Sequence, residues 1–201
     1  MNASRQFRLV PSAIALAITF TTAQPQAARP GEVVPPPVPA TLEAPAGHKA
    51  FLIGRAYGTQ NYSCLPSQGV IKWVPAGPQA TVFDAEARQI LTHYLSASPE
   101  DGELRATWRH SNDTSTIWAS LDIRTYSEPD FVAPGAIPWL RIRVGGKQYG
   151  PTWGDKMTVT TYLQRVNTVG GIAPATGCAL AGDIGKRQFV PYAADYVFYK
   201  E

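Results

Sequence analysis

Tryptophan and arginine recur at every second position in three short segments of the sequence. These alternating sets are Arg105, Thr107 and Arg109; Trp118, Asp122 and Arg124; and Trp139, Arg141 and Arg143. Residues two apart on a strand share one face, so three neighbouring strands would present two indoles among five guanidinium groups. Aromatic rings stack on sugars, and arginine binds carboxylate or sulfate through two parallel hydrogen bonds. We therefore predict an acidic-polysaccharide surface formed by Trp118, Arg124, Trp139, Arg141 and Arg143. The alternative is a solvated sheet face, or a second core in which arginine stems cover the tryptophans.

Four other residues are candidates for catalysis. His110 and Asp113 flank Ser111, but no G-x-S-x-G motif is present, and residues one to three apart rarely converge on one substrate atom. The alternative for this cluster is a polar turn capped by its own side chains. Arg165 and Asn167 are expected to point outward from a strand and to offer a guanidinium and an amide to an anionic or polyol ligand. They could equally form an internal salt bridge and satisfy loop backbone. A small hydrolase or lyase would need His110, Asp113, Arg165 and Asn167 in one loop pocket.

Metal and cofactor motifs are missing from the sequence. It contains no HExxH motif, no paired histidines at helical or strand spacing, and no acidic run of the calcium-loop type. We predict neither a metal site nor a cofactor.

The segments that carry the candidate residues show a two-residue periodicity. In Thr116–Arg124 the apolar members are predicted to face inward and the others outward, and 139–144 behaves in the same way. The inward set of the first segment is Ile117, Ala119, Leu121 and Ile123. Segment 190–199 is apolar on both faces, which predicts a central strand. Further strand candidates are Ala50–Tyr57, Val70–Val74, Ala80–Phe83, Leu104–His110 and Met157–Val166.

One segment, Ala85–Leu95, fits either a helix or a hairpin that turns at 85–88, and we favour the hairpin. Many short strands separated by Gly, Pro, Asn and Asp clusters are typical of all-β domains. We therefore predict a single antiparallel β-sandwich or barrel over residues 47–201.

The N-terminus has the order of a cleavable signal peptide. Arg5 and Arg8 precede an apolar run from Leu9 to Phe20, which is shorter than the roughly 20 residues of a membrane-spanning helix. We predict cleavage after Ala23, or after Ala28, and export to the periplasm, the cell surface or the medium, with no membrane span in the mature chain. The alternative is an amphipathic N-terminal helix of a cytosolic protein.

Cleavage would change the charge of the protein. Two of the 18 Lys and Arg residues lie in the predicted leader, and none of the 15 Asp and Glu residues does. The mature chain would therefore carry 16 basic and 15 acidic residues, a net charge of +1. This near-neutral charge gives no basis for a nucleic-acid partner. Residues 24–46 are rich in proline and are predicted to form an extended lead.

The two cysteines, Cys64 and Cys178, would both enter an oxidising compartment after export. A disulfide is the economical interpretation; a catalytic thiol or a metal ligand is the alternative. The loop between the two cysteines is long, and the chain-entropy model gives an upper limit of about 4–5 kcal/mol for the stabilisation by a disulfide that closes it.

Several blocks of the sequence resemble the domain-of-unknown-function family 3455. They are residues 58–64 (GTQNYSC), 137–140 (IPWL), 161–168 (TYLQRVNT), 170–171 (GG), 177–178 (GC) and 192–199 (YAADYVFY). The resemblance implies a small secreted protein and no particular activity. Function therefore has to be inferred from the residues themselves. We expect a non-enzymatic secreted domain that binds an acidic polysaccharide or another envelope ligand, with an extracytoplasmic enzyme and a surface or matrix adhesion protein as alternatives.

Overall fold

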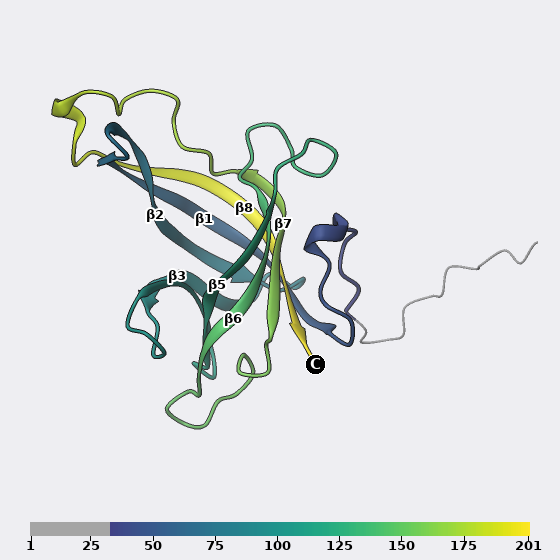
Figure 1. Cartoon of the computed structure of the whole chain (residues 1–201). Helices are drawn as coiled ribbons and strands as arrows, with labels where there is room; N and C mark the ends of the chain where they lie inside the picture. The colour runs from purple at the N-terminus through teal and green to yellow at the C-terminus, as the bar shows by residue number, and fades with distance from the viewer. Residues whose placement is uncertain (1–32) are drawn as a thin grey trace, which may run out of the picture. The chain divides into compact units, whose positions relative to one another are not determined.

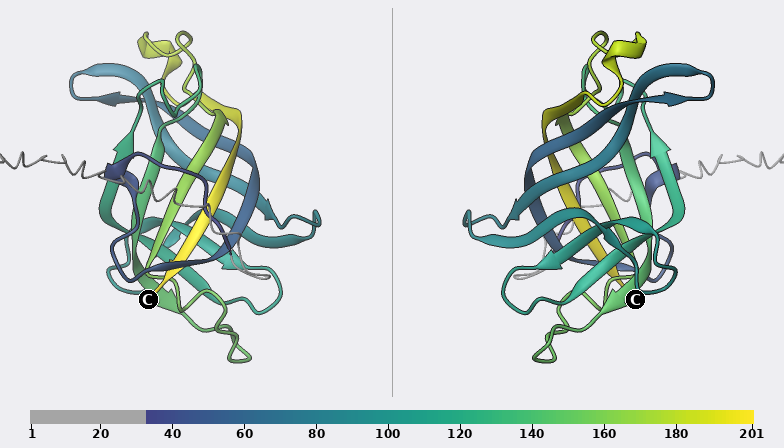
Figure 2. Two further views of the ribbon diagram at one scale, coloured as in Figure 1. Left: turned by 90° about the vertical axis from the view of Figure 1, so that its right-hand side faces the viewer. Right: turned by 90° about the vertical axis from the view of Figure 1, so that its left-hand side faces the viewer.

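The computed structural model describes residues 33–201, which form a closed antiparallel barrel of eight strands. Each strand pairs with the next along the chain, and the last pairs with the first (Figures 1 and 2). The strands are β1 Lys49–Ser67, β2 Val70–Phe83, β3 Gln89–Ala97, β4 Leu104–His110, β5 Thr116–Tyr126, β6 Trp139–Gln148, β7 Tyr162–Gly170 and β8 Arg187–Lys200. The all-β prediction is confirmed, and the sheet closes as a barrel. Within residues 33–201, no helix is long and apolar enough to cross a membrane.

The barrel interior is filled by small residues on β1 opposite large ones on β8. Gly54, Ala56 and Gly58 share the inward face of β1. A Cβ on Gly54 would lie 2.5 Å from Cγ1 of Val82, so only glycine fits there. The matching space is occupied by the aromatic rings of β8, chiefly Tyr196, which is 5.6 Å from Trp108 between ring centroids. Interiors of narrow barrels are typically filled by such small and large pairs.

A second apolar cluster lies on the outside of the barrel. It joins Leu42 from the N-terminal segment to Trp139, Val166 and Val197 from the sheet. The 3₁₀ turn η1, Ala40–Leu42, buries Leu42 completely, and the Gln164 side-chain N–H donates to the Leu42 carbonyl at 2.7 Å. The described part of the proline-rich lead therefore packs against the barrel. The predicted signal peptide, residues 1–23, lies outside the described residues.

β2 separates from β3 beyond the barrel wall. The two strands pair only between Ala80 and Phe83, whereas β2 stays paired with β1 to Val70. The far half of the β1–β2 hairpin and the start of β8 thus project as an arm, defined here as residues 61–78 and 172–189 (Figure 1). The predicted disulfide is confirmed: Cys64 and Cys178 are bonded, and the bridge joins the hairpin to the 171–186 loop.

The observed strands confirm one local prediction and correct another. Ala85–Leu95 is a hairpin and not a helix, because Asp84 accepts hydrogen bonds from Glu86 N and Arg88 N and closes the turn. The inward assignment of Leu121 was wrong: its side chain is 79% exposed. The β5–β6 register shifts between Ala119 and Ile123, so two-residue alternation does not continue through this bulge.

The disulfide supports a direct stability prediction. Replacing Cys64 and Cys178 together with alanine should lower the free energy of unfolding by about 2–5 kcal/mol, because the 114-residue separation is no longer closed in the unfolded chain. Urea denaturation of both proteins measures this difference. A reducing agent should destabilise the wild type and leave the variant unchanged; equal midpoints for the two oxidised proteins would contradict the prediction.

Candidate functional site

Two pockets that open to the outside of the barrel share Tyr94 in their linings, and the first reaches through the wall to the inward residues Ala80 and His93. The first lies over β1, β2 and β3, where the β2–β3 ladder ends, and the second lies over β3 to β6. We call the two together the Tyr94 groove. Its lining residues are Tyr57, Gly58, Gln79, Ala80, Thr81, Thr92, His93, Tyr94, Arg109, Thr114, Thr116, Trp118, Gln148, Tyr149 and Pro151. Hydroxyl, amide and aromatic side chains predominate in it.

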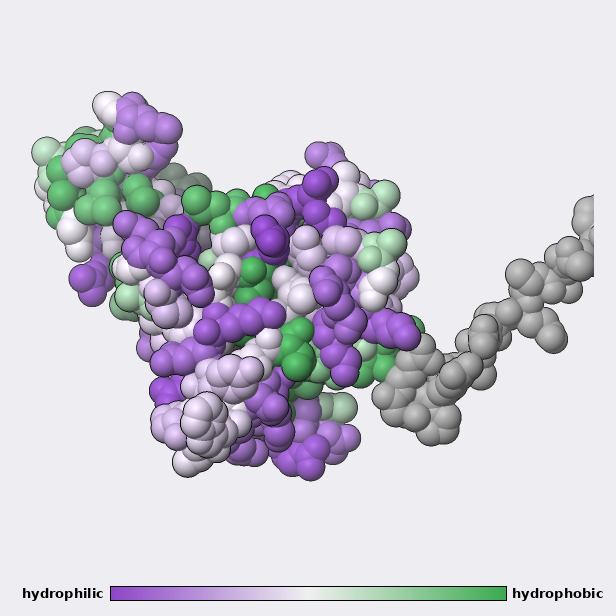
Figure 3. Space-filling view, turned by 60° about the horizontal axis from the view of Figure 1, so that its bottom comes forward, coloured by the Kyte–Doolittle hydropathy of each residue, from purple (hydrophilic) through white to green (hydrophobic). Residues whose placement is uncertain are grey.

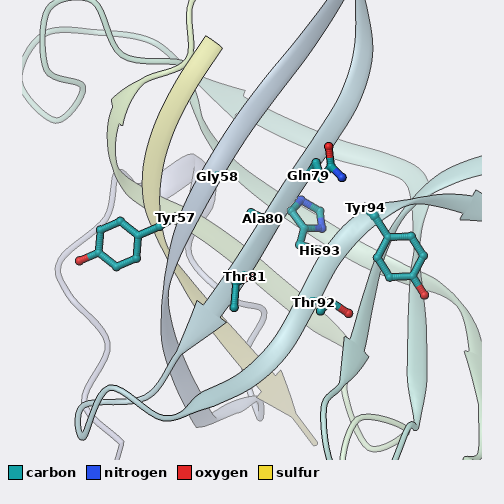
Figure 4. A pocket seen from close by; sticks show the side chains of 8 residues that line it. All are labelled: Tyr57, Gly58, Gln79, Ala80, Thr81, Thr92, His93 and Tyr94. Atoms are coloured by element: carbon teal, nitrogen blue, oxygen red, sulfur yellow. The ribbon is translucent and has the colours of Figure 1, made fainter. Parts of the chain in front are cut away.

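The first pocket has a volume of about 530 Å³, within the usual range of small-molecule sites. Figure 4 shows Tyr57 and Tyr94 on opposite sides of it, with the His93 ring between β2 and β3. The Nδ1 atom of His93 lies 2.8 Å from the Thr107 carbonyl, so Nδ1 carries the proton and Nε2 is left as an acceptor. His93 also stacks on Trp108, with 4.2 Å between ring centroids.

His93 is uncharged at physiological pH. Burial lowers the pKa of this imidazole to about 3; the hydrogen bond to Thr107 opposes the shift, and the charge of Arg165 adds to it. The neutral ring can accept a hydrogen bond from a ligand hydroxyl but cannot bind an anion through its own charge.

The second pocket, of about 270 Å³, contains the only charged side chain in the lining of the groove, Arg109. Within residues 33–201, Arg109 forms no ion pair or side-chain hydrogen bond. No carboxylate is among the lining residues of either pocket. The groove therefore offers one uncompensated positive charge beside hydroxyl and amide groups.

Trp153 stands beside the second pocket and is 84% exposed. Its ring lies 6.5 Å from that of Tyr149 between centroids. The tight turn that carries it is closed by Gly150 N donating to the Gly154 carbonyl at 2.8 Å. A side chain on either glycine would collide with the Asp113 carbonyl oxygen, so the turn is packed closely against the 111–115 turn. Trp153 itself has a φ of 64°, a strained value for a bulky residue.

Asp113 joins the two turns. Its carboxylate accepts hydrogen bonds from Ser115 N at 3.0 Å and from Lys156 N at 2.9 Å. Burial disfavours the charge of Asp113, but these hydrogen bonds outweigh it and hold the pKa of the carboxyl below its ordinary value. His110 accepts through Nδ1 from the Asn112 and Asp113 backbone N–H groups, so Nδ1 is unprotonated and its contact with Asp113 is not an ion pair. Burial, opposed by Asp113, lowers the pKa of His110.

The four candidate catalytic residues are not brought together. His110 and Asp113 cap a turn, which matches the alternative given for them. Arg165 points into the barrel, contrary to the outward prediction: it donates to the Pro138 carbonyl at 2.9 Å and lies beside the buried Tyr196 phenol. Asn167 lies on the outside and donates to Asp195, which also pairs with Arg55. Within the described residues, no hydrogen bond or ion pair links the His110–Asp113 pair to Arg165 or Asn167.

The fold separates the tryptophans of the predicted surface from its arginines: the tryptophans are buried, and two of the three arginines are exposed. Trp118 and Trp139 are each only 5% exposed. The indole of Trp118 donates to Ser96 Oγ at 2.8 Å, and Trp139 is covered by Phe131 and the outer cluster. Neither indole therefore presents an open ring face to a ligand.

The three arginines of that surface do lie together. Arg124 is directly opposite Arg141 across β5 and β6, and Arg143 is two residues further along β6. We call these three residues the arginine patch. Arg141 already holds the N-terminal segment, since it donates to the Glu43 carbonyl at 2.7 Å and lies over the Tyr162 ring. Arg124 and Arg143 are exposed.

Sequence reasoning missed most of the groove. Tyr57, Tyr94 and His93 come from strands that meet only through the barrel register, which no local pattern encodes. Trp153 could have been found, because Gly150-Pro151-Thr152-Trp153-Gly154 is a turn signal around an aromatic residue. Among residues 33–201, no three His, Cys, Asp or Glu side chains are grouped so as to hold a metal ion.

The fold and groove define the class of the protein: an eight-stranded antiparallel β-barrel with a disulfide-linked arm and a polar, aromatic outer groove. A family model described as "Protein of unknown function (DUF3455)" matches residues 45–200, and the chain belongs to this family. No curated protein and no solved structure matches the chain.

Burial of His93 predicts a pH-dependent stability. The folded-state pKa of about 3 is below the ordinary 6.5, so the unfolded chain binds this proton first and stability falls as pH drops below 6.5. The free-energy advantage of the wild type over His93→Gln should shrink by up to about 2 kcal/mol between pH 7 and pH 5.

Chemical denaturation of both proteins at each pH measures this difference. His110 and the carboxylates also lower the stability of the fold in acid, but they do so equally in both proteins. Comparing the two proteins therefore removes their contributions. A constant difference between pH 7 and pH 5 would show that His93 does not titrate in the way described.

Proposed function

We propose that this protein is a non-enzymatic binding module for an acidic polysaccharide, and that the ligand occupies the Tyr94 groove. The observation that carries the proposal is the groove lining, which combines aromatic rings, hydroxyl and amide groups, and one uncompensated guanidinium. Hydroxyls and amides pair with sugar hydroxyls, and a lone arginine favours a ligand that carries a carboxylate or sulfate.

The aromatic residues supply the contact area. Tyr57 and Tyr94 flank the first pocket, and Tyr149 with Trp153 lies beside the second. Tyrosine and tryptophan offer large apolar faces with few rotatable bonds, so ordering them on a ligand costs little conformational entropy. The backbone of Trp153 is already held by a closed turn, so this part of the ordering precedes binding.

Export would place the groove where polysaccharides are available. We propose that residues 1–23 are a signal peptide and that the mature protein is periplasmic, on the cell surface or extracellular. The Cys64–Cys178 disulfide supports this, because disulfides persist in oxidising compartments.

Three other hypotheses make different predictions. The arginine patch could bind the anionic groups, with Trp118 and Trp139 acting only as packing beneath the surface. An extracytoplasmic hydrolase or lyase would need a catalytic set other than His110, Asp113, Arg165 and Asn167, whose contacts are separate. A surface or matrix adhesion protein would use the same exposed aromatic residues against a larger partner.

Replacing Trp153 with alanine should weaken binding of a uronic-acid hexasaccharide at least tenfold, about 1.4 kcal/mol, because the main exposed ring beside the groove is lost. Calorimetry measures the affinity. Phe189→Ala is a matched control, since this exposed aromatic residue lies on the arm. Equal affinities for wild type, Trp153→Ala and Tyr94→Ala would reject the groove as the site, because Tyr94 lines both pockets.

Charge recognition can be assigned by a second substitution. Arg109→Gln should reduce affinity for the uronic-acid hexasaccharide about tenfold or more and leave affinity for its carboxyl-reduced, neutral counterpart unchanged. The paired substitution Arg124→Gln with Arg143→Gln should have little effect on either ligand. If the Arg124 and Arg143 variant lost affinity for the acidic ligand and Arg109→Gln did not, the anion site would lie at the arginine patch and not in the groove.

A further inference from the structure

The end of the arm exposes a group of apolar side chains. Leu180 is 70% exposed and Val70 is 56% exposed, and Leu65 and Ile184 are exposed by 41% and 45%. The hairpin turn places Val70 close to Leu65, while backbone hydrogen bonds between Cys64 and residues 185–186 extend the β1–β8 ladder to the Ile184 loop. Figure 3 shows hydrophobic residues gathered on this projecting end of the molecule.

The same part of the chain is basic. The arm contains Lys72, Lys186 and Arg187, and Asp183 is its only acidic residue. That carboxylate is already occupied, because it accepts hydrogen bonds from Ala179 N, Leu180 N and the Lys186 ammonium group. These hydrogen bonds, with the charge of Lys186, hold the pKa of Asp183 far below its ordinary range, so Asp183 stays ionised and attached to its own loop. Arg187 has no ion-pair partner in the described chain.

The arm end is also held in a fixed shape. The Cys64–Cys178 bridge ties the hairpin to the loop that carries Leu180 and Ile184. Trp73 adds a hydrogen bond from its indole N–H to the Thr176 carbonyl at 3.0 Å. The two segments that carry the exposed apolar side chains are therefore held together at the end of the arm, so little further backbone ordering would be needed on contact with a partner.

We propose that the end of the arm docks on the surface of a membrane that contains anionic lipids. Leu65, Val70, Leu180 and Ile184 enter the interface between headgroups and acyl chains, and Lys72 and Arg187 bind the anionic headgroups. An exposed apolar group bordered by basic residues has the chemistry of a peripheral membrane contact, in which apolar burial and attraction to anionic lipid act together. This inference is independent of the groove and its ligand.

Co-sedimentation of the predicted mature chain, residues 24–201, with vesicles tests the proposal, because the apolar and basic leader would itself bind lipid. Vesicles of phosphatidylcholine with 30% phosphatidylglycerol should retain at least about tenfold more protein than pure phosphatidylcholine vesicles, and high salt should reduce the difference. Leu180→Ser with Ile184→Ser should abolish most of the binding. Leu121→Ser with Leu104→Ser is the matched control, because both leucines are exposed outside the arm, and it should bind like the wild type.

A charge pair completes the experiment. Lys72→Gln with Arg187→Gln should remove the preference for phosphatidylglycerol, whereas Arg124→Gln with Arg143→Gln should retain it. Equal retention by the two vesicle types, or wild-type binding by the Leu180 and Ile184 variant, would overturn the proposal. So would sedimentation showing that the wild type is a dimer and this variant a monomer, because the apolar group would then be covered by a second copy of the chain.

Discussion

The structure depends on the pairing of β1 with β8, which closes the sheet. The ladder runs from Lys49 opposite Lys200 to Ser63 opposite Arg187 and brings together the two ends of the barrel domain. This pairing is possible because the inward residues of β1 are small where the inward residues of β8 are aromatic. Closure gives every strand a paired neighbour on both sides and buries the apolar cluster in which Trp108 and Tyr196 meet.

One departure from regular pairing generates both surfaces to which we assign roles. Since β2 leaves β3 beyond Ala80, the pocket over His93 opens on one side of the divergence and the arm projects from the other. The disulfide and the small residues of β1 thus fix the strands beside the first pocket and at the end of the arm.

Local patterns predicted the strands well and the surfaces poorly. Alternation correctly indicated strands from Thr116, Trp139 and Val190, and two cysteines in an exported chain indicated the bridge. The alternation pattern placed Leu121 on the inward face because alternation does not reveal a bulge. The prediction also treated every outward residue as exposed. Trp118 and Trp139 lie on the outward face but are each only 5% exposed, a property that tertiary packing determines. The groove joins residues from six strands, so its composition follows from register and closure and not from any one segment.

The central claim is that an acidic oligosaccharide binds in the Tyr94 groove, and the five indole N–H groups of the protein report on it directly. A titration of the ¹⁵N-labelled protein with a uronic-acid hexasaccharide, followed by NMR, separates the indole signals by location. The account predicts a large, saturable shift for Trp153, a smaller one for Trp118, and unchanged signals for Trp139 and for Trp73 on the arm. Shifts centred on Trp139, near the arginine patch, or no shift at millimolar ligand, would contradict it.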